Sequence, residues 1–179
     1  MKTLTLLRHA KSGWDDPVAR DFDRPLNPRG RRAAQTVGRE MRAQELAFDR
    51  VLASPAVRVV ETLEEIASGY GRALGPAFDQ RLYLATADIL LDLIRDTDDQ
   101  VNSLLMVGHN PGLELLVLLL TREGEGELRD QAEIKYPTAT LAEITLPVER
   151  WRDVKERIGT LSRFIRPRDL DPELGPDLY

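Results

Sequence analysis

The sequence predicts an α/β fold with parallel strands, and three apolar runs of strand length carry this prediction. The runs span residues 3–7, 51–53 and 103–107, and none has the apolar–polar alternation of a half-buried strand. Segments with helical periodicity separate them. Strands covered on both faces by helices are typical of parallel sheets. In such sheets ligands bind beyond the carboxyl ends of the strands, so the residues after each run are candidates for a site.

The first two helices have clear start signals. One is expected over residues 28–44, with a proline at its first position and Asn27 as its cap. Another is expected to begin at Pro55, with Ser54 as its cap. This second helix would carry Arg58 on its first turn, close to the carboxyl end of the preceding strand. The junction between the strand at residues 51–53 and this helix therefore places a cation at the carboxyl edge of the sheet.

The chain as a whole is expected to form one domain over residues 1–165, followed by a C-terminal tail without defined structure over residues 166–179. No internal repeat or linker divides it. The other expected elements are a short extended piece at residues 77–78, an amphipathic helix after Thr86, a buried helix over residues 113–120, a surface loop over residues 122–131, a strand over residues 138–146 that could pair at a sheet edge, and a weak helix over residues 151–164.

Composition excludes several functions. The chain has 179 residues, a formal net charge of −5 and no cysteine. The negative charge argues against non-specific nucleic-acid binding, which requires a basic footprint. The lack of cysteine excludes disulfides, thiolate zinc sites and cysteine nucleophiles. Only two histidines are present, and no carboxylate spacing suggests a metal site, so we expect neither a metal nor another cofactor.

We expect a cytoplasmic protein that does not enter membranes. The apolar stretch near the amino terminus is shorter than the ~7 to 15 residues of a signal-peptide core. The longest apolar run, residues 115–120, is far below the ~18 residues of a membrane span.

Four side chains follow the strand ends and would meet in one crevice. Arg8 and His9 end the first strand, Arg58 begins the second helix, and His109 follows the third apolar run. No acidic cluster adjoins them in the sequence, so an anion is the expected ligand. Guanidinium groups match the geometry of phosphate oxygens, which makes phosphate the leading candidate.

This set of residues suits phosphoryl transfer. A neutral histidine in line with the phosphoryl group can attack phosphorus, while arginines neutralise the equatorial oxygens. The second histidine would donate a hydrogen bond to the phosphoryl group. Lys11 and Ser12 are further candidates for phosphate binding, although a solvated loop explains them equally well. The chain has no nucleotide-binding P-loop motif.

Three short motifs carry a family resemblance. The segment 7–10, Leu-Arg-His-Ala, resembles the Arg-His-Gly signature of the histidine phosphatase superfamily. Segments 54–62 and 107–111 resemble its second and third motifs, and segment 26–30 resembles the helix-opening stretch between the first two. The small bacterial phosphohistidine phosphatases of the SixA type are the closest likeness. The resemblance implies a three-layer α/β sandwich with a mainly parallel central sheet, the phosphoglycerate mutase-like fold.

The resemblance also implies roles for the four residues. His9 would be the phosphorylated nucleophile, and Arg8, Arg58 and His109 would form the phosphate pocket. One departure is Ala10, which replaces the usual glycine and adds one methyl group beside the nucleophile.

The second departure concerns the proton donor. Many relatives that cleave phosphate esters use a carboxylic acid between the second and third motifs, but residues 79–86 contain no glutamate, although Asp79 and Asp88 are near. General acid catalysis contributes ~10²- to 10⁴-fold for a poor leaving group, whereas a protonated phosphoimidazole leaves readily. The lack of a glutamate in residues 79–86 therefore favours a phosphohistidine substrate. The other acidic residues that could fold into the site are Asp15, Asp16 and Glu61. Glu61 is better explained as a residue that orients Arg58 or lies on a solvated helix face. Asp21, Asp23 and Arg24 are best explained as a local ion-pair cluster.

Three functions remain open. The first is a phosphohistidine phosphatase that acts on a phosphorylated protein or peptide of the histidine-phosphotransfer type, a partner that fits a role in signal transduction. The second is a phosphomonoesterase or mutase that acts on a small phosphorylated substrate. The third is a phosphopeptide-binding module without catalysis, against which the retained nucleophile argues.

Overall fold

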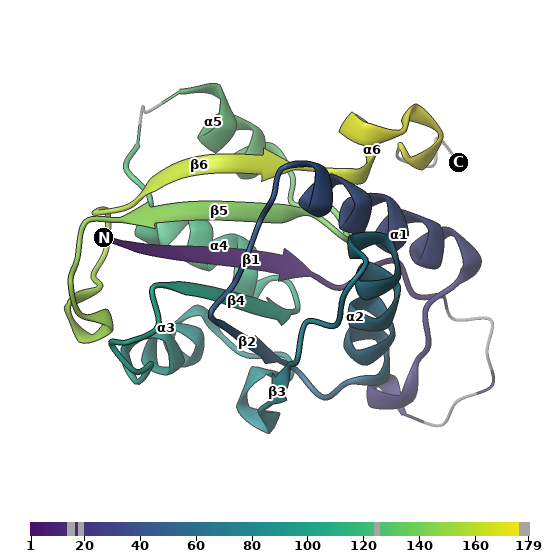
Figure 1. Ribbon diagram of the computed structural model, residues 1–179, viewed down its shortest axis with the longest axis horizontal. Helices are drawn as coiled ribbons and strands as arrows, with labels where there is room; N and C mark the ends of the chain where they lie inside the picture. The colour runs from purple at the N-terminus through teal and green to yellow at the C-terminus, as the bar shows by residue number, and fades with distance from the viewer. Residues whose placement is uncertain (14–16, 18–19, 124–125, 176–179) are drawn as a thin grey trace.

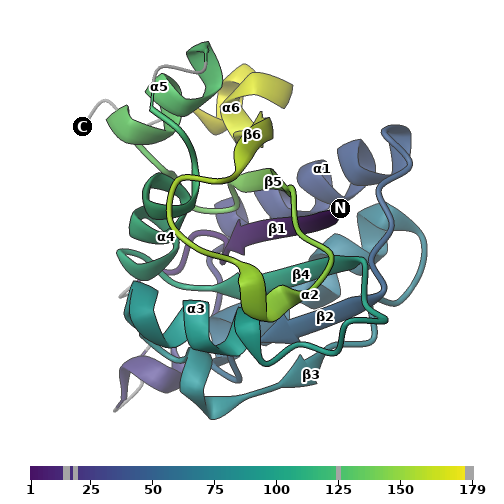
Figure 2. The same cartoon turned by 90° about the vertical axis from the view of Figure 1, so that its left-hand side faces the viewer.

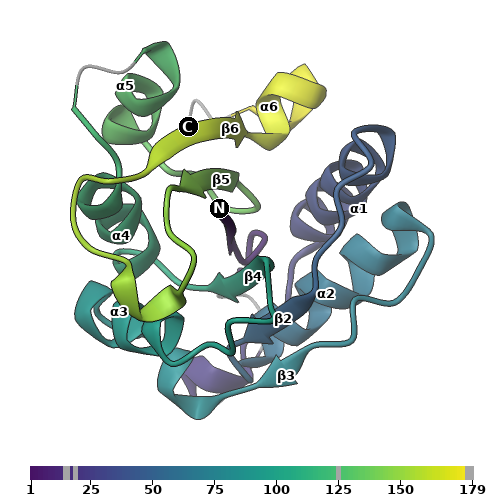
Figure 3. The same cartoon turned by 60° about the vertical axis from the view of Figure 1, so that its left-hand side comes forward.

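A six-stranded sheet forms the centre of the molecule, with helices on both faces (Figure 1). The structure is a computed structural model that describes residues 1–13, 17, 20–123 and 126–175. The strand order is β3-β2-β4-β1-β5-β6. The three layers are clearest in Figure 3, where α3, α4 and α5 lie on one side of the sheet and α1 and α2 on the other. The predicted three-layer α/β sandwich with a mainly parallel sheet is confirmed.

The strands at the centre of the sheet are parallel. β1 pairs in parallel with β4, which pairs in parallel with β2, which in turn pairs with β3. β5 and β6 extend the sheet as antiparallel strands beside β1. The strand bounds are β1 Lys2–Arg8, β2 Arg50–Ala53, β3 Ala77–Phe78, β4 Ser103–Gly108, β5 Leu141–Leu146 and β6 Thr160–Ile165.

Side chains on the two central strands supply two separate cores. Leu4 and Leu6 of β1 belong to the core under α3, α4 and α5, whereas Leu7 belongs to the core under α1 and α2. All three are fully buried, which explains why the run has no polar face. The register pairs Arg8 with Gly108, so that the residue after each strand, His9 or His109, emerges at the same edge of the sheet.

The helices follow the sequence predictions closely in the first two thirds of the chain. The Asn27 side chain accepts a hydrogen bond from Gly30 N at 2.7 Å and caps α1, as expected. The helix α2 starts later than predicted, with Ala56 as its cap residue; the Ser54 hydroxyl accepts from Ala56 N at 3.3 Å and also bonds His109. The bounds are α1 Pro28–Ala43, α2 Val57–Tyr70, α3 Ala87–Arg95, α4 Gly112–Leu120 and α5 Glu127–Ile134.

Gly30 sets how closely α1 approaches the first strand's exit. A Cβ atom built at this position would lie 2.1 Å from the backbone oxygen of Lys11. Only glycine permits this approach. The amino terminus of α1 is therefore held against the segment that follows His9.

Three predictions in the last third of the chain are wrong. The expected loop at 122–131 contains the start of α5, whose Arg129 and Ala132 are buried. The expected helix at 151–164 is instead a short 3-10 turn, Trp151–Asp153, followed by β6. β5 is not at the edge, because it lies between β1 and β6. Figure 2 shows β6 beside β5, with α5 next to it.

Much of the predicted tail is folded. The short helix α6, Pro167–Leu170, and the 3-10 turn Pro172–Leu174 lie against α1 (Figure 1). Arg32 of α1 pairs with Asp171 at 2.6 Å and with Glu173 at 2.8 Å, and the carbonyl oxygen of Gly175 accepts a hydrogen bond from Arg29. These contacts fix the segment beside the carboxyl edge of the sheet.

Among the described residues, no helix has the length and apolar character needed to cross a membrane.

Candidate active site

The side chains predicted to act together lie at the carboxyl edge of β1 and β4. His9 follows β1, His109 follows β4, and Arg58 comes from the first turn of α2. The ring centroids of the two histidines are 5.3 Å apart. All three side chains are buried, with exposed fractions of 9% for His9, 3% for His109 and 3% for Arg58.

Among the described residues, His9 is held through one ring nitrogen, Nδ1. Its Nδ1 lies 2.7 Å from the carbonyl oxygen of Ala10, an atom that can only accept, so Nδ1 carries the proton. Burial is the main cause that lowers the pKa of His9 to about 3; the hydrogen bond to Ala10 acts in the opposite direction, and His109, Arg58 and Arg8 lower the pKa further. The ring is therefore neutral near pH 7, with its lone pair on Nε2. This is the state that a nucleophilic imidazole requires.

Ala10 fits this arrangement without widening the site. It is fully buried, and its backbone N–H donates to the Thr62 hydroxyl at 2.9 Å. The methyl group that replaces the glycine hydrogen packs in the core beneath α1 and α2.

His109 uses both ring nitrogens. Arg58 Nη2 lies 3.3 Å from Nδ1, and because a guanidinium only donates, Nδ1 accepts. Nε2 then carries the proton and donates to the Ser54 hydroxyl at 2.8 Å. Burial and then Arg58 lower the pKa of His109 to about 4, so this ring is also neutral. Ser54 is thus a positioning residue for His109, a role that the sequence analysis missed because it assigned Ser54 to helix capping.

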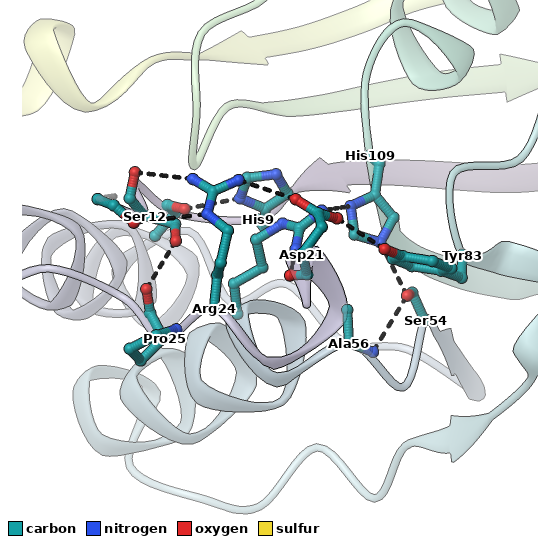
Figure 4. A network of polar contacts seen from close by, with 12 residues as sticks. His9, Ser12, Asp21, Arg24, Pro25, Ser54, Ala56, Tyr83 and His109 are labelled. Carbon is teal, nitrogen blue, oxygen red and sulfur yellow. Dashed lines mark hydrogen bonds and ion pairs between the residues drawn. The ribbon is translucent and has the colours of Figure 1, made fainter. Parts of the chain in front are cut away.

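Asp21 lies against Arg58, a contact that was not predicted from the sequence. Arg58 donates from Nη1 to the Asp21 backbone oxygen at 2.8 Å and from Nη2 to the Asp21 carboxylate at 3.0 Å. Arg24 and Tyr83 donate to the same carboxylate at 3.0 and 2.6 Å. Figure 4 shows Asp21, Tyr83, His109 and Ser54 in one continuous set of polar contacts.

The ionisation of Asp21 follows from these partners. Burial, the largest single influence, acts to raise its pKa, but the bonds from Tyr83, Arg24 and Arg58 together lower it to about 2. Asp21 is therefore a carboxylate that neutralises Arg58 in this structure. The predicted ion-pair cluster exists, because Arg24 binds Asp21 and Arg20 binds Asp23, but it also reaches into the site.

Arg8 binds the segment that precedes β5. Its Nη1 donates to the carbonyl oxygen of Tyr136 at 2.9 Å, an oxygen that also accepts from the Asn110 side chain at 3.0 Å. Burial is the main influence that lowers the pKa of Arg8. The charges of Arg8 and Arg58 both contribute to the low pKa of His9.

Comparisons with known proteins identify the family. The sequence profile of the histidine phosphatase superfamily (branch 1) matches residues 4–83. Uncharacterized protein Rv1276c of Mycobacterium tuberculosis is 34% identical over 164 residues, which span 90% of this chain and all of that protein. The chain belongs to the histidine phosphatase superfamily.

Solved structures of this superfamily share the fold over nearly the whole chain. A candidate phosphohistidine phosphatase SixA from Nakamurella multipartitia has a TM-score of 0.79 at 27% identity and covers 93% of this chain and 96% of its own. The protein histidine phosphatase SixA in complex with tungstate has a TM-score of 0.76 at 23% identity, with 94% and 99% covered. This histidine phosphatase is thus a SixA-like member of the superfamily, as its motifs predict.

The weaker sequence candidates lie around the site in structural roles. The Ser12 hydroxyl donates to the Pro25 carbonyl oxygen at 2.7 Å and ties the loop before α1 to β1's exit. Glu61 does not orient Arg58: it accepts from Leu26 N at 2.8 Å and pairs with Arg31 at 3.1 Å. Lys11 lines a neighbouring pocket together with Arg8.

The other acidic candidates are not in this contact network. Asp79 pairs with Arg81 at 2.8 Å and caps a 3-10 turn, and Asp88 is exposed on the first turn of α3. Asp15 and Asp16 lie outside the described residues. Across the ranges that the structure describes, no three or more histidine, aspartate or glutamate side chains gather where they could hold a metal ion.

Proposed function

We propose that this histidine phosphatase removes the phosphoryl group of phosphohistidine on a protein or peptide, and that His9 carries the phosphoryl group in between. One observation carries the choice of substrate: the carboxyl group bonded to the site, Asp21, is ionised and bound to Arg58. Such a group is a poor proton donor for an alkoxide. A phosphoimidazole protonated on its other nitrogen needs no donor from the enzyme.

The first step is an in-line transfer to His9. The Nε2 lone pair forms a bond to phosphorus while the P–N bond of the substrate breaks, and the electron pair of that bond stays on the substrate imidazole. The imidazole leaves neutral because its other nitrogen is already protonated. The Ala10 carbonyl oxygen, 2.7 Å from Nδ1, holds the His9 proton and supports the positive charge that develops on the ring.

In the second step water attacks the phosphoenzyme. A P–O bond forms, the bond between phosphorus and His9 breaks, and Nε2 recovers its lone pair as the water loses a proton to solvent. Phosphate leaves. Both steps need a binding pocket for the equatorial oxygens more than they need covalent chemistry from other residues.

Arg8, Arg58 and His109 would form that pocket. Arg58 is buried and already binds one carboxylate, so the phosphoryl group would take the place of Asp21. The negative charge of the phosphoryl group raises the proton affinity of His109, whose Nδ1 can then donate instead of accepting. Ser54 keeps the ring in place during this change through the bond to Nε2.

The alternative, a phosphomonoesterase, has one specific observation in its favour. Once a substrate displaces Asp21 from Arg58, the carboxyl group loses one of the bonds that lower its pKa and stays within reach of the site through Tyr83. It could then protonate an ester oxygen. The third possibility, a phosphopeptide-binding module, is tested by the same experiment.

The test compares phosphate release from a phosphohistidine protein and from a panel of small phosphomonoesters. Wild type is expected to prefer phosphohistidine, His9→Ala to be inactive on both, and Asp21→Asn to keep most activity on phosphohistidine. A ~10²-fold or larger loss for Asp21→Asn on esters that wild type cleaves faster would favour the phosphomonoesterase. Binding of phosphopeptide without turnover by wild type would favour the binding module.

A further inference from the structure

A basic pocket adjoins the phosphate site and is not used by the mechanism. It has a volume of about 420 Å³, within the usual range for small-ligand sites. It lies between α1, the segment before β5, and α6, which rests on α1 (Figure 1). The cations that line it are Arg8, Lys11, Arg29, Lys135, Arg166 and Arg168.

The charge of this pocket is opposite to that of the chain as a whole. The net charge of the chain is −5, yet none of the described residues that line the pocket is acidic. The nearest carboxylate on α6, that of Asp169, is bound to Arg166 at 2.8 Å. Within the described ranges, Lys135 and Arg168 have no carboxylate within 4.0 Å.

Arg8 connects the pocket to the site of phosphoryl transfer. It directly precedes His9, lowers the pKa of that ring by its charge, and also lines the pocket. Its Nε is buried without a hydrogen-bond partner among the described residues, and its Nη1 is held by the Tyr136 carbonyl oxygen. A buried donor of this kind has a favourable partner in an anion. Glu114 is the carboxylate that interacts most strongly with Arg8, but it does not line the pocket.

We propose that this pocket is a second anion-binding subsite, which holds a negatively charged group of the substrate beside the phosphoryl group on its way to His9. The preferred source of this negatively charged group is an acidic side chain next to the phosphohistidine, and in this respect the inference rests on the proposed function. A second phosphate on a small substrate supplies the same chemistry, and the experiment separates the two. A substrate with both groups places one on Arg58 and His109 and the other among Lys135, Arg166 and Arg168.

The first arm uses a pair of phosphohistidine peptides that differ only in glutamate or glutamine at the positions flanking the phosphohistidine. Wild type is expected to show a kcat/KM about tenfold higher for the acidic peptide, which corresponds to ~1.4 kcal/mol. Lys135→Glu and Arg168→Glu are expected to reduce or reverse this ratio. The preference is also expected to fall as salt is raised.

The matched controls are Lys155→Glu and Arg152→Glu. Both residues are exposed and lie near the 3-10 turn Trp151–Asp153, close to Lys2 at the opposite end of β1. They change the net charge by the same amount as the pocket variants. The ratio between the two peptides should stay that of wild type in both controls.

The second arm needs no phosphohistidine. Bisphosphonates with spacers of one to four methylene groups are compared with methylphosphonate as inhibitors of turnover of whichever phosphorylated substrate the enzyme accepts. A bisphosphonate advantage that is lost in Lys135→Glu and Arg168→Glu, without any preference among peptides, identifies a second phosphate as the source. Inactivity on every phosphohistidine substrate rejects the proposed function, whereas inhibition by bisphosphonates still tests whether the pocket binds a second anion. Equal kcat/KM for both peptides together with equal inhibition by mono- and bisphosphonates overturns the subsite.

Discussion

Asp21→Asn should make the enzyme bind phosphate more tightly. In the resting structure the Asp21 carboxylate occupies Arg58 at 3.0 Å, so an incoming phosphoryl group must displace it. Asparagine keeps the shape and can still accept from Tyr83, but it removes the negative charge. The part of this stabilisation that comes from the contact with Arg58 is the free energy that phosphate must overcome.

The pKa of Asp21 gives the size of the expected change in phosphate affinity. A fall from 3.8 to about 2 corresponds to ~2.4 kcal/mol, at ~1.36 kcal/mol for each factor of ten in proton affinity. Tyr83 and Arg24 also contribute to this shift, and solvent screens the side chain, which is 35% exposed, so the part that belongs to the Arg58 contact is ~1 kcal/mol. Phosphate affinity should then rise about fivefold in Asp21→Asn.

The assay is titration of phosphate or tungstate at pH 7 by calorimetry, with competitive inhibition as a second readout. Asp23→Asn is the matched control, since Asp23 lies in the same 3-10 turn, Asp21–Asp23, and pairs with Arg20 rather than with Arg58. Its affinity should equal that of wild type. Unchanged or weaker binding in Asp21→Asn would refute the claim that Asp21 competes with the phosphoryl group.

Three further predictions address His9, the residue that positions His109, and the fold. First, the pKa of His9 is about 3 in the folded chain and 6.5 is its ordinary value, so the unfolded state binds more protons than the folded state below pH 6.5. The free energy of unfolding of wild type, measured in urea, should therefore fall from pH 7 to pH 5 more steeply than that of His9→Asn. Equal slopes would contradict the low pKa of His9. Second, Ser54→Ala removes the acceptor of His109 Nε2 and should lower kcat by about tenfold with little change in KM, whereas a wild-type kcat would show that Ser54 does not position the ring. Third, Gly30→Ala places a methyl group 2.1 Å from the Lys11 backbone oxygen and should destabilise the chain by ~1 to 3 kcal/mol in urea unfolding. Arg39→Ala, at an exposed position of α1, is the control, and a Gly30→Ala variant as stable as wild type would show that α1 does not approach this closely.

The core of the site was predictable because local sequence determines it. An apolar run followed at once by a polar residue places that residue at a strand end, and parallel strands bring their carboxyl ends to one edge. The register that pairs Arg8 with Gly108 then sets His9 beside His109. The start of α1 was predictable for a similar reason, since Asn27 caps the helix through a bond to Gly30, three residues away.

The parts that failed depend on contacts between distant segments. Asp21 reaches Arg58 only through the path of the segment before α1, which no periodicity encodes. Ser54 fits the pattern of a helix cap, but its hydroxyl bonds His109 from another strand. Trp151, Val154 and Ile158 have helical spacing by chance: Trp151 and Val154 are buried in the core before the chain turns into β6, whose place is set by pairing with β5.

The most direct test of the account is to trap the phosphoenzyme. Wild type and His9→Asn would be mixed with a phosphohistidine protein labelled with radioactive phosphate, quenched in alkali within milliseconds, and mapped by mass spectrometry. A transient, acid-labile and alkali-stable phosphoryl group is expected on His9 of wild type, and no label is expected on the variant. Rapid phosphate release by wild type with no label on His9 at any time, or equal turnover by the variant, would show that His9 is not the nucleophile.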